Sequence, residues 1–251
     1  MLKPFWQNIF RSDVLFGLVM ILLLGIPRFI LVLNANVTGN YNLISLIFLF
    51  MWISPFIFLT RSGRSQIGMT KPTNATWLLY SFLSGIIFCV LIYIVAVILF
   101  GHSISNWFVY ISNSYQVADP GLSADDRTGY FIIYSIIGMT FSPVGEELFY
   151  RGIVHESFKK KWGDNKASYI DSLAFALTHL AHFGIVYVSG AWRFLFVPAI
   201  LWVLFMFLAS RIFFYCRQKT GSIAGAVMSH AGFNFAMMYV IFYYVLDVNN
   251  P

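Results

Sequence analysis

Residues 76–100 read TWLLYSFLSGIIFCVLIYIVAVILF, a stretch of 25 residues without one charged side chain. A helix of about 20 mostly apolar residues is long enough to cross the hydrocarbon core of a bilayer. Of the 251 residues in the chain, 59% are hydrophobic and only 10% are charged, whereas ordinary soluble domains have roughly 25% charged residues. One globular core cannot enclose that much apolar surface. The composition therefore excludes a soluble enzyme, a disulfide-bonded scaffold and a disordered chain, and it predicts an integral membrane protein.

Seven stretches are long and apolar enough, or nearly so, to span a membrane: about 13–33, 41–60, 76–100, 129–152, 169–185, 193–215 and 222–246. We predict an all-α polytopic transmembrane bundle of about seven spans, with an eighth left open, forming a single integral membrane domain over residues 1–251. The fifth stretch is short and contains several polar residues, so hydropathy alone supports it only weakly as a span. An amphipathic patch after the third stretch is expected to lie along the membrane surface; it consists of Trp107, Phe108, Tyr110 and Ile111.

The basic residues predict the orientation. With the N-terminus placed in the cytoplasm, 13 of the 16 Lys and Arg residues, including the Lys159–Lys161 cluster, fall on the cytoplasmic side, as the positive-inside rule requires. The net charge of +6 is explained by this topology and by anionic lipid headgroups, and no nucleic-acid partner is expected. Arg28 is one of the three exceptions, and its side chain is expected to extend outward to the headgroups.

Ionisable groups inside a bilayer cost about 2.5–3.5 kcal/mol even on lenient scales, so they mark functional candidates. Counted inward from the cytoplasmic ends at 1.5 Å per residue, Glu146, His179 and His230 lie at similar depths of about 18, 16 and 13 Å. This agreement predicts one buried polar site that opens toward the cytoplasm. It includes residues of the fourth, fifth and seventh stretches: Glu146, Glu147, Arg151, His179, His230 and Asn234.

Helical spacing assigns these side chains to faces. Glu147 and Arg151 are four residues apart and are expected to form an ion pair, whereas Glu146 is rotated by about 100° and stays free for chemistry. His230 and Asn234 share a face, with the small Gly232 between them admitting another backbone or a substrate. Two further polar residues of the fifth stretch, His182 and Asp171, fit a structural role better, and Asp171 is expected to reach the interface.

Three motifs contain these residues: E-E-x-x-x-R at Glu146–Arg151, F-x-x-x-H at Phe175–His179 and H-x-x-x-N at His230–Asn234. The ordered set resembles the CPBP intramembrane endopeptidases, also called the Abi or CAAX-protease family. That family includes eukaryotic enzymes that trim prenylated CAAX proteins and bacterial proteins linked to bacteriocin processing or immunity. The resemblance covers a catalytic core of about residues 129–246, and the earlier stretches match only as generic spans.

The resemblance implies a glutamate-type intramembrane endopeptidase whose site is reached from the cytoplasm. It implies that Glu146 activates water together with His179, and that His230 and Asn234 stabilise the oxyanion. Glu147, Arg151 and Phe175 would support them. Amide hydrolysis does need an activated water and donors aimed at the oxyanion. The expected substrate is a peptide or a membrane-protein precursor, and the expected location is a bacterial plasma membrane; the sequence does not indicate the oligomeric state.

Other mechanisms find less support in the sequence. The chain has no H-E-x-x-H motif for a zinc protease, no G-x-S-G motif, and one intramembrane aspartate where an aspartyl protease needs two. No cofactor is expected; zinc on Glu146, His179 and His230 is stereochemically allowed but not favoured. The alternative function is a non-catalytic bacteriocin-immunity or transport-accessory protein that binds a peptide in the same polar cavity.

Overall fold

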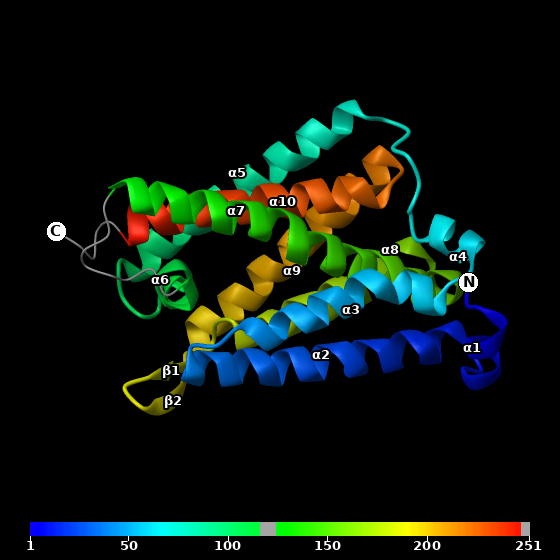
Figure 1. Cartoon of the computed structure of the whole chain (residues 1–251), viewed down its shortest axis with the longest axis horizontal. Helices are drawn as coiled ribbons and strands as arrows, with labels where there is room; N and C mark the ends of the chain where they lie inside the picture. The colour runs from blue at the N-terminus through cyan, green and yellow to red at the C-terminus, as the bar shows by residue number, and fades with distance from the viewer. Residues whose placement is uncertain (116–123, 247–251) are drawn as a thin grey trace.

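The computed structural model describes residues 1–115 and 124–246, most of which are helical. Helices of the first half are α1 (Pro4–Ile9), α2 (Asp13–Thr38), α3 (Asn42–Phe58), α4 (Arg61–Gln66), α5 (Thr76–Phe100), α6 (Trp107–Ser112) and the 3₁₀ turn η1 (Asn113–Tyr115). α2 and α3 run along the long axis of an elongated bundle, which α5 crosses obliquely, with α1 and α4 at one end and α6 at the other (Figure 1).

The second half begins with α7 (Ala124–Glu147), which continues directly into the π-helix η2 (Leu148–Val154) and then into α8 (His155–Thr178). α8 is kinked at Gly163, whose φ of 78° lies in the left-handed region. The remaining elements are η3 (His179–Ala181), β1 (Ile185–Val188), β2 (Ala191–Phe194), α9 (Phe196–Thr220), α10 (Ile223–Val240) and the π-helix η4 (Ile241–Val245). β1 and β2 form an antiparallel hairpin at the end of the bundle opposite α1 (Figure 1).

Local sequence explains where these helices begin and end. The Ser12 side chain accepts a hydrogen bond from the amide of Leu15 and caps α2, and the Ser222 side chain caps α10 in the same way through Ala224. Side-chain oxygens at this position satisfy amides that have no partner within the helix. α9 ends at Thr220, and the next residue, Gly221, has a φ of 66°, a conformation that favours glycine. The tight turn from α9 to α10 follows from Gly221 and Ser222.

The predicted all-α membrane bundle is confirmed, because each of the seven apolar stretches contains a helix. Four helical segments of the described residues are long and apolar enough to cross a membrane: α2, α5, α9 and Ile223–Val245. The shorter α3 is also apolar. The number of seven crossings and the cytoplasmic N-terminus stay predictions.

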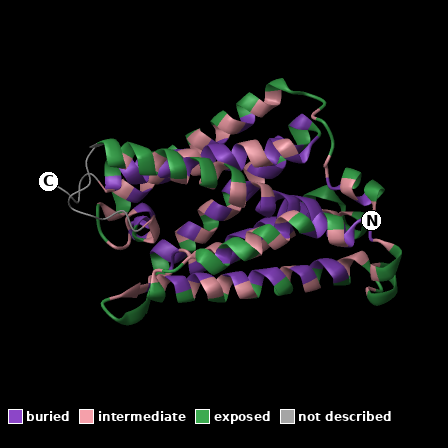
Figure 2. Cartoon of the chain, in the orientation of Figure 1, coloured by how far each residue is buried: buried purple, intermediate pink, exposed green. Residues whose placement is uncertain are grey.

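Large apolar side chains cover the outside of the bundle, which is the arrangement expected of a protein solvated by lipid. On α5, for example, Leu79, Ile87 and Ile98 are exposed, and Ile98 reaches 75% exposure. Figure 2 shows exposed residues recurring along the outer faces of α2, α3, α5 and α7, while buried residues face the centre. The apolar surface that excludes a soluble protein is therefore on the outside of the fold.

Glycines bring α5 and α10 into close contact. A Cβ atom on Gly85 would overlap the backbone of Ser229, and a Cβ atom on Gly232 would overlap the carbonyl oxygen of Phe82. Small residues permit such approach between membrane helices. The backbone that Gly232 admits is therefore that of α5.

The amphipathic patch in α6 was expected on the membrane surface, and this prediction is wrong. Trp107, Phe108 and Tyr110 are buried in the protein. The indole of Trp107 donates to the carbonyl of Pro198, 3.0 Å away, and stacks on Trp202 with ring centroids 6.0 Å apart. Aromatic side chains of α6 fill the end of the bundle, because neighbouring helices offer an apolar environment there as good as that of lipid.

Candidate active site

The structure brings Glu146, His179, His230 and Asn234 to the wall of one cavity of about 310 Å³. The cavity lies among α2, α3, α7, α9 and α10, and Phe175 of α8 also lines it. Glu146 comes from the end of α7, His179 begins η3, and the other two lie on α10. Residues that are up to 88 positions apart in the sequence therefore meet at one place, which agrees with their similar predicted depths.

Glu147 connects two helices beside this cavity. Its Oε2 lies 3.1 Å from Nε of Arg151, so the predicted ion pair is confirmed. Its other oxygen, Oε1, accepts a hydrogen bond of 2.8 Å from Nδ1 of His230. All three side chains are buried, and Glu147 and Arg151 are fully so. Glu147 thus orients a residue on α10 as well as stabilising Arg151, a contact that helical spacing alone does not reveal.

The contact with Glu147 also determines what His230 can do. Because Nδ1 donates to a carboxylate, Nε2 is the nitrogen that faces Glu146, at 3.5 Å from its Oε2. A neutral ring in this tautomer presents a lone pair at Nε2, whereas an imidazolium presents an N–H. His230 can therefore donate a hydrogen bond at Nε2 only when both ring nitrogens carry a proton. Phe213 stacks on the ring at 4.8 Å between centroids.

Arg28 was expected to extend to the outer headgroups, and this prediction is wrong. Its side chain is 2% exposed and forms an ion pair with Glu146, so Glu146 is not free of partners either. Nη1 of Arg28 also donates to Oγ1 of Thr178, 3.3 Å away. The expectation failed because α2 extends to Thr38; Arg28 therefore lies well inside the helix, and a cation there needs a counter-charge.

His179 is held by its backbone neighbours. Its Nδ1 donates to the carbonyl of Phe175 at 2.8 Å, which leaves Nε2 as the nitrogen available to a ligand or water. The carbonyl of His179 accepts from the indole of Trp202 at 3.0 Å. His182, for which a structural role was favoured, also lines the cavity, and its Nε2 has no hydrogen-bond partner in the described part of the chain.

Asn234 and Phe175 complete the wall. Nδ2 of Asn234 donates to the carbonyl of Gly138 at 2.8 Å and makes a longer contact of 3.4 Å with Oγ of Ser142, both on α7. The Phe175 ring lies under the guanidinium of Arg151, 4.2 Å from Cζ to its centroid, a distance typical of cation–π contacts. It also contacts the His179 ring, with centroids 4.2 Å apart.

Residues 128–236 match the family model described as type II CAAX prenyl endopeptidase, Rce1-like. The matched region contains all three motifs and every cavity residue that the motifs supply. The resemblance to the CPBP/CAAX-protease family is confirmed. No curated protein and no solved structure matches the chain.

The cavity extends from the polar site toward one end of the bundle. From Glu146 and His230, the cavity extends to Tyr41, Ser114 and Tyr115, at the end of the bundle where α3 begins and η1 lies (Figure 1). Toward the opposite end, which carries the Lys159–Lys161 cluster, the whole segment Leu148–Val154 is buried. No residue of this segment lines the cavity.

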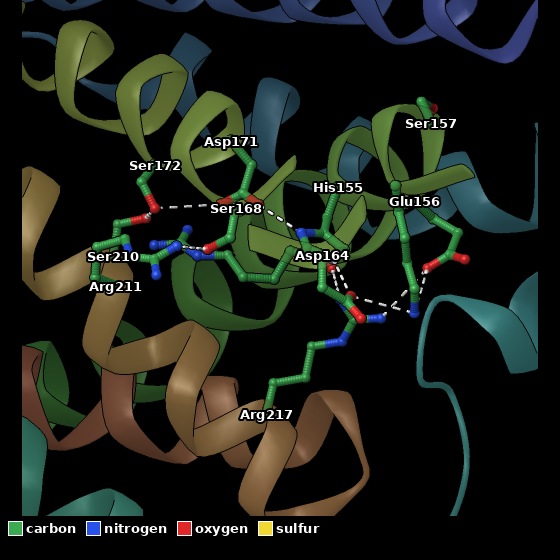
Figure 3. Close-up of polar contacts among 12 residues, drawn as sticks. His155, Glu156, Ser157, Asp164, Ser168, Asp171, Ser172, Ser210, Arg211 and Arg217 are labelled. Carbon is green, nitrogen blue, oxygen red and sulfur yellow. Dashed lines mark hydrogen bonds and ion pairs between the residues drawn. The ribbon is translucent and has the colours of Figure 1, made fainter. Parts of the chain in front are cut away.

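A second polar cluster within residues 128–236 consists of His155, Asp164 and Asp171 (Figure 3). His155 has Asp171 at 2.8 Å from Nδ1 and Asp164 at 3.1 Å from Nε2. Asp171 is fully buried, so the expectation that it reaches the interface is wrong; His155 supplies its partner instead. Nearby, Arg217 donates to the carbonyl of Arg151.

The same cluster shifts a pKa outside the predicted spans. Partial burial raises the pKa of the Asp164 carboxyl, but the hydrogen bond with His155 and the ammonium of Lys159, 3.3 Å away, outweigh burial. The pKa of Asp164 is therefore below its usual value. The cluster connects the two parts of α8 across its kink at Gly163.

The sequence allows zinc on Glu146, His179 and His230 but does not favour it. Within residues 1–115 and 124–246, no three His, Cys, Asp or Glu side chains are grouped as a metal-binding set. Glu146 is instead in contact with Arg28 and His230.

Proposed function

We propose that this chain is an intramembrane endopeptidase of the CAAX-protease type, which hydrolyses a peptide bond in a peptide or a membrane-associated precursor. The observation that carries the proposal is the meeting of Glu146, His179, His230 and Asn234 on one buried cavity. The family match supports a peptidase, and no observation favours the non-catalytic alternative.

In the proposed mechanism, Glu146 is the general base. Its Oε1 is engaged by Arg28, so Oε2 is the oxygen that takes a proton from the attacking water. Glu146 then returns this proton to the leaving amine nitrogen as the C–N bond of the tetrahedral intermediate breaks. His179 holds the same water through Nε2, because its Nδ1 is already bound to the carbonyl of Phe175. A positioned base of this kind contributes typically about 10²–10⁴-fold to the rate.

The oxyanion is stabilised from α10. His230 is held by Glu147 through Nδ1 and would donate from Nε2 when the ring carries a proton on both nitrogens, a charge that strengthens the hydrogen bond. Asn234 donates through Nδ2 by exchanging its long contact with Ser142 for the oxyanion, while its shorter bond to Gly138 keeps the amide in place. Such donors act where water is excluded and charge develops.

We further propose that the substrate enters from the end of the bundle that carries Tyr41 and Ser114. The direction of the cavity supports this entry, and the buried segment Leu148–Val154 does not support the predicted access from the lysine-rich end. Under the predicted orientation this end faces outside, in a bacterial plasma membrane. The reaction as proposed uses side chains of this chain alone, without a cofactor.

The test compares protein N-termini in membranes of cells that produce the wild type or Glu146→Gln at equal abundance. Mass spectrometry of N-terminal peptides should find at least one new N-terminus that requires the wild type. Incubating a synthetic peptide spanning that cleavage site with purified wild-type protein should reproduce the cut. Identical N-terminal profiles, with the biological activity intact in Glu146→Gln, would mean that the protein acts by binding rather than by hydrolysis.

A further inference from the structure

Glu146 has a charged partner that the matched region does not contain. Arg28 lies on α2, before residues 128–236, and forms a buried ion pair with Oε1 of Glu146. The guanidinium is held from other sides as well. Nη1 donates to Thr178 of α8 at 3.3 Å, and Cζ lies 5.3 Å from the centre of the Phe48 ring on α3. Three helices thus fix the position of this cation against the carboxylate.

We propose that Arg28 is a positioning residue for Glu146. It keeps the buried carboxylate ionised and occupies Oε1, so that Oε2 is the oxygen presented to the reactants. The role of Glu146 as a general base rests on the proposed function. The effect of Arg28 on the charge of Glu146 does not depend on turnover and can be measured without a substrate.

The surroundings of Glu146 explain why a cation is needed. The Glu146 residue is 1% exposed, and a carboxyl group removed from water favours its neutral form unless an opposite charge compensates. His230 on α10 lies 3.5 Å away but is shared with Glu147. Glu147 is itself negative and lies next to Glu146 in sequence. Neither His230 nor Glu147 therefore provides a counter-charge for Glu146 alone.

The remaining charged and titratable groups around the site do not replace Arg28. Arg151 pairs with Glu147 rather than with Glu146. His179 and His182 also line the cavity. A proton on either ring would be repelled by the nearby Arg28 guanidinium. Among the described residues, Arg28 is therefore the guanidinium in direct contact with Glu146.

A purely structural role for Arg28 makes a different prediction. Arg28 would then only attach α2 to the rest of the bundle, and the charge of Glu146 would not depend on it. Asn36 provides a matched control, because it lies on the same helix and donates from Nδ2 to the carbonyl of Ala181 at 3.0 Å without touching Glu146. Asn36→Ala removes an α2 contact of similar kind and leaves the ion pair intact.

The direct test is infrared spectroscopy of the purified full-length protein between pH 5 and pH 10. The signal of Glu146 is identified by its loss in Glu146→Gln. We expect Glu146 to be ionised at pH 7 in the wild type, in Arg28→Lys and in Asn36→Ala. In Arg28→Gln we expect the C=O band of a protonated carboxylic acid at pH 7, which disappears at alkaline pH and is missing from Arg28→Gln/Glu146→Gln. An ionised Glu146 in Arg28→Gln at pH 7 would overturn the proposal.

A second measurement covers the case in which Arg28→Gln accumulates poorly. Breaking a buried pair by removing one partner is strongly destabilising, whereas removing both charges is much less so. The double variant Arg28→Gln/Glu146→Gln should therefore recover the monodisperse yield and thermal midpoint lost in Arg28→Gln. Equal losses in the single and double variants would show that Arg28 acts independently of Glu146 and would overturn the proposal.

The kinetic consequence can be measured once a substrate is in hand. Arg28→Gln should lower kcat at pH 7 by about 10²–10⁴, the usual contribution of a general base, with little change in KM. Raising the pH or restoring the charge in Arg28→Lys should recover part of kcat. If the wild type cleaves nothing while the infrared result holds, the proposed function fails and the inference about Arg28 is supported.

Discussion

At the scale of single residues, the site is a short series of contacts in which each side chain fixes the next. Arg151 pairs with Glu147, Glu147 orients His230, His230 faces Glu146, and Glu146 pairs with Arg28. Two carboxylates are thus balanced by two guanidinium groups within a buried region. Such a series predicts that substitutions differ in whether they affect folding or chemistry.

Asn234→Ala should reduce turnover without reducing the amount of folded protein. The amide contributes one of two proposed oxyanion donors, and removing one such donor costs about 10²–10³-fold in kcat. The bond to the Gly138 carbonyl is also lost, but Asn234 is only partly buried. Cleavage rate and monodisperse yield, measured together, check this expectation. A loss of kcat as large as that of Glu146→Gln would assign Asn234 a different role.

Glu147→Gln should lower stability and activity together. The substitution leaves Arg151 as an uncompensated buried charge, at a cost of roughly 3–5 kcal/mol, and weakens the hydrogen bond that orients His230. Glu156→Gln is the matched control, because Glu156 lies 3.8 Å from Lys159 and Arg217 in a partly exposed position, where ion pairs contribute little. Thermal unfolding in detergent compares the two. A Glu147→Gln protein with the wild-type midpoint would contradict the role described for Glu147.

At the scale of helices, the fold depends on close approach between α5 and α10, the helix that carries His230 and Asn234. Gly232→Leu should push the two helices apart, because even a Cβ atom there overlaps the carbonyl of Phe82. Overpacking usually costs about 1–3 kcal/mol, and backbone overlap should place this variant at or above that range. Gly129→Ala is the control, since a Cβ atom at Gly129 meets no atom within 4 Å. Equal thermal midpoints for both variants would be inconsistent with this packing.

The kink of α8 should respond to pH through Asp164. Because the pKa of Asp164 is lowered in the folded protein, its stabilising contribution is present above the ordinary aspartate range near pH 4 and is lost as the pH falls through the lowered value. Asp164→Asn should therefore lower the thermal midpoint modestly at pH 7, and the difference from the wild type should shrink toward pH 3. A constant difference across this range would contradict the contribution of the charge.

At the scale of the whole molecule, the two ends of the bundle differ in charge, and the cavity extends toward the end opposite the lysine cluster. In intact cells, a membrane-impermeant maleimide should label Asp125→Cys and Ser114→Cys but not Lys160→Cys. The native Cys89 and Cys216 are both buried, so the background should be low. Labelling of Lys160→Cys from outside would reverse the predicted orientation. Labelling of Asp125→Cys without Ser114→Cys would contradict entry at that end.

The sequence predicts much of this molecule because membrane helices follow simple rules. Apolar length locates the helices, and the cost of burying charge marks Glu146, His179 and His230 as candidates at one depth. Contacts between distant helices were not predictable: Arg28 and Glu146 are far apart in sequence, and no spacing rule pairs them. Hydropathy also cannot separate a surface that faces lipid from one that faces protein. The apolar residues of α6 therefore predict a helix on the membrane surface, whereas its aromatic residues are buried in the protein.

The ion pair between Arg28 and Glu146 has an evolutionary consequence. The glutamate lies in the segment shared with the CAAX-protease family, whereas the arginine lies outside the matched region. The two halves of the chain are therefore not interchangeable parts. A chimera that joined this C-terminal half to the N-terminal helices of a relative would leave Glu146 buried without a counter-charge. It would avoid this only if the relative also placed a cationic side chain at the position of Arg28. Recombination among such proteins should consequently preserve the pair or lose both members together.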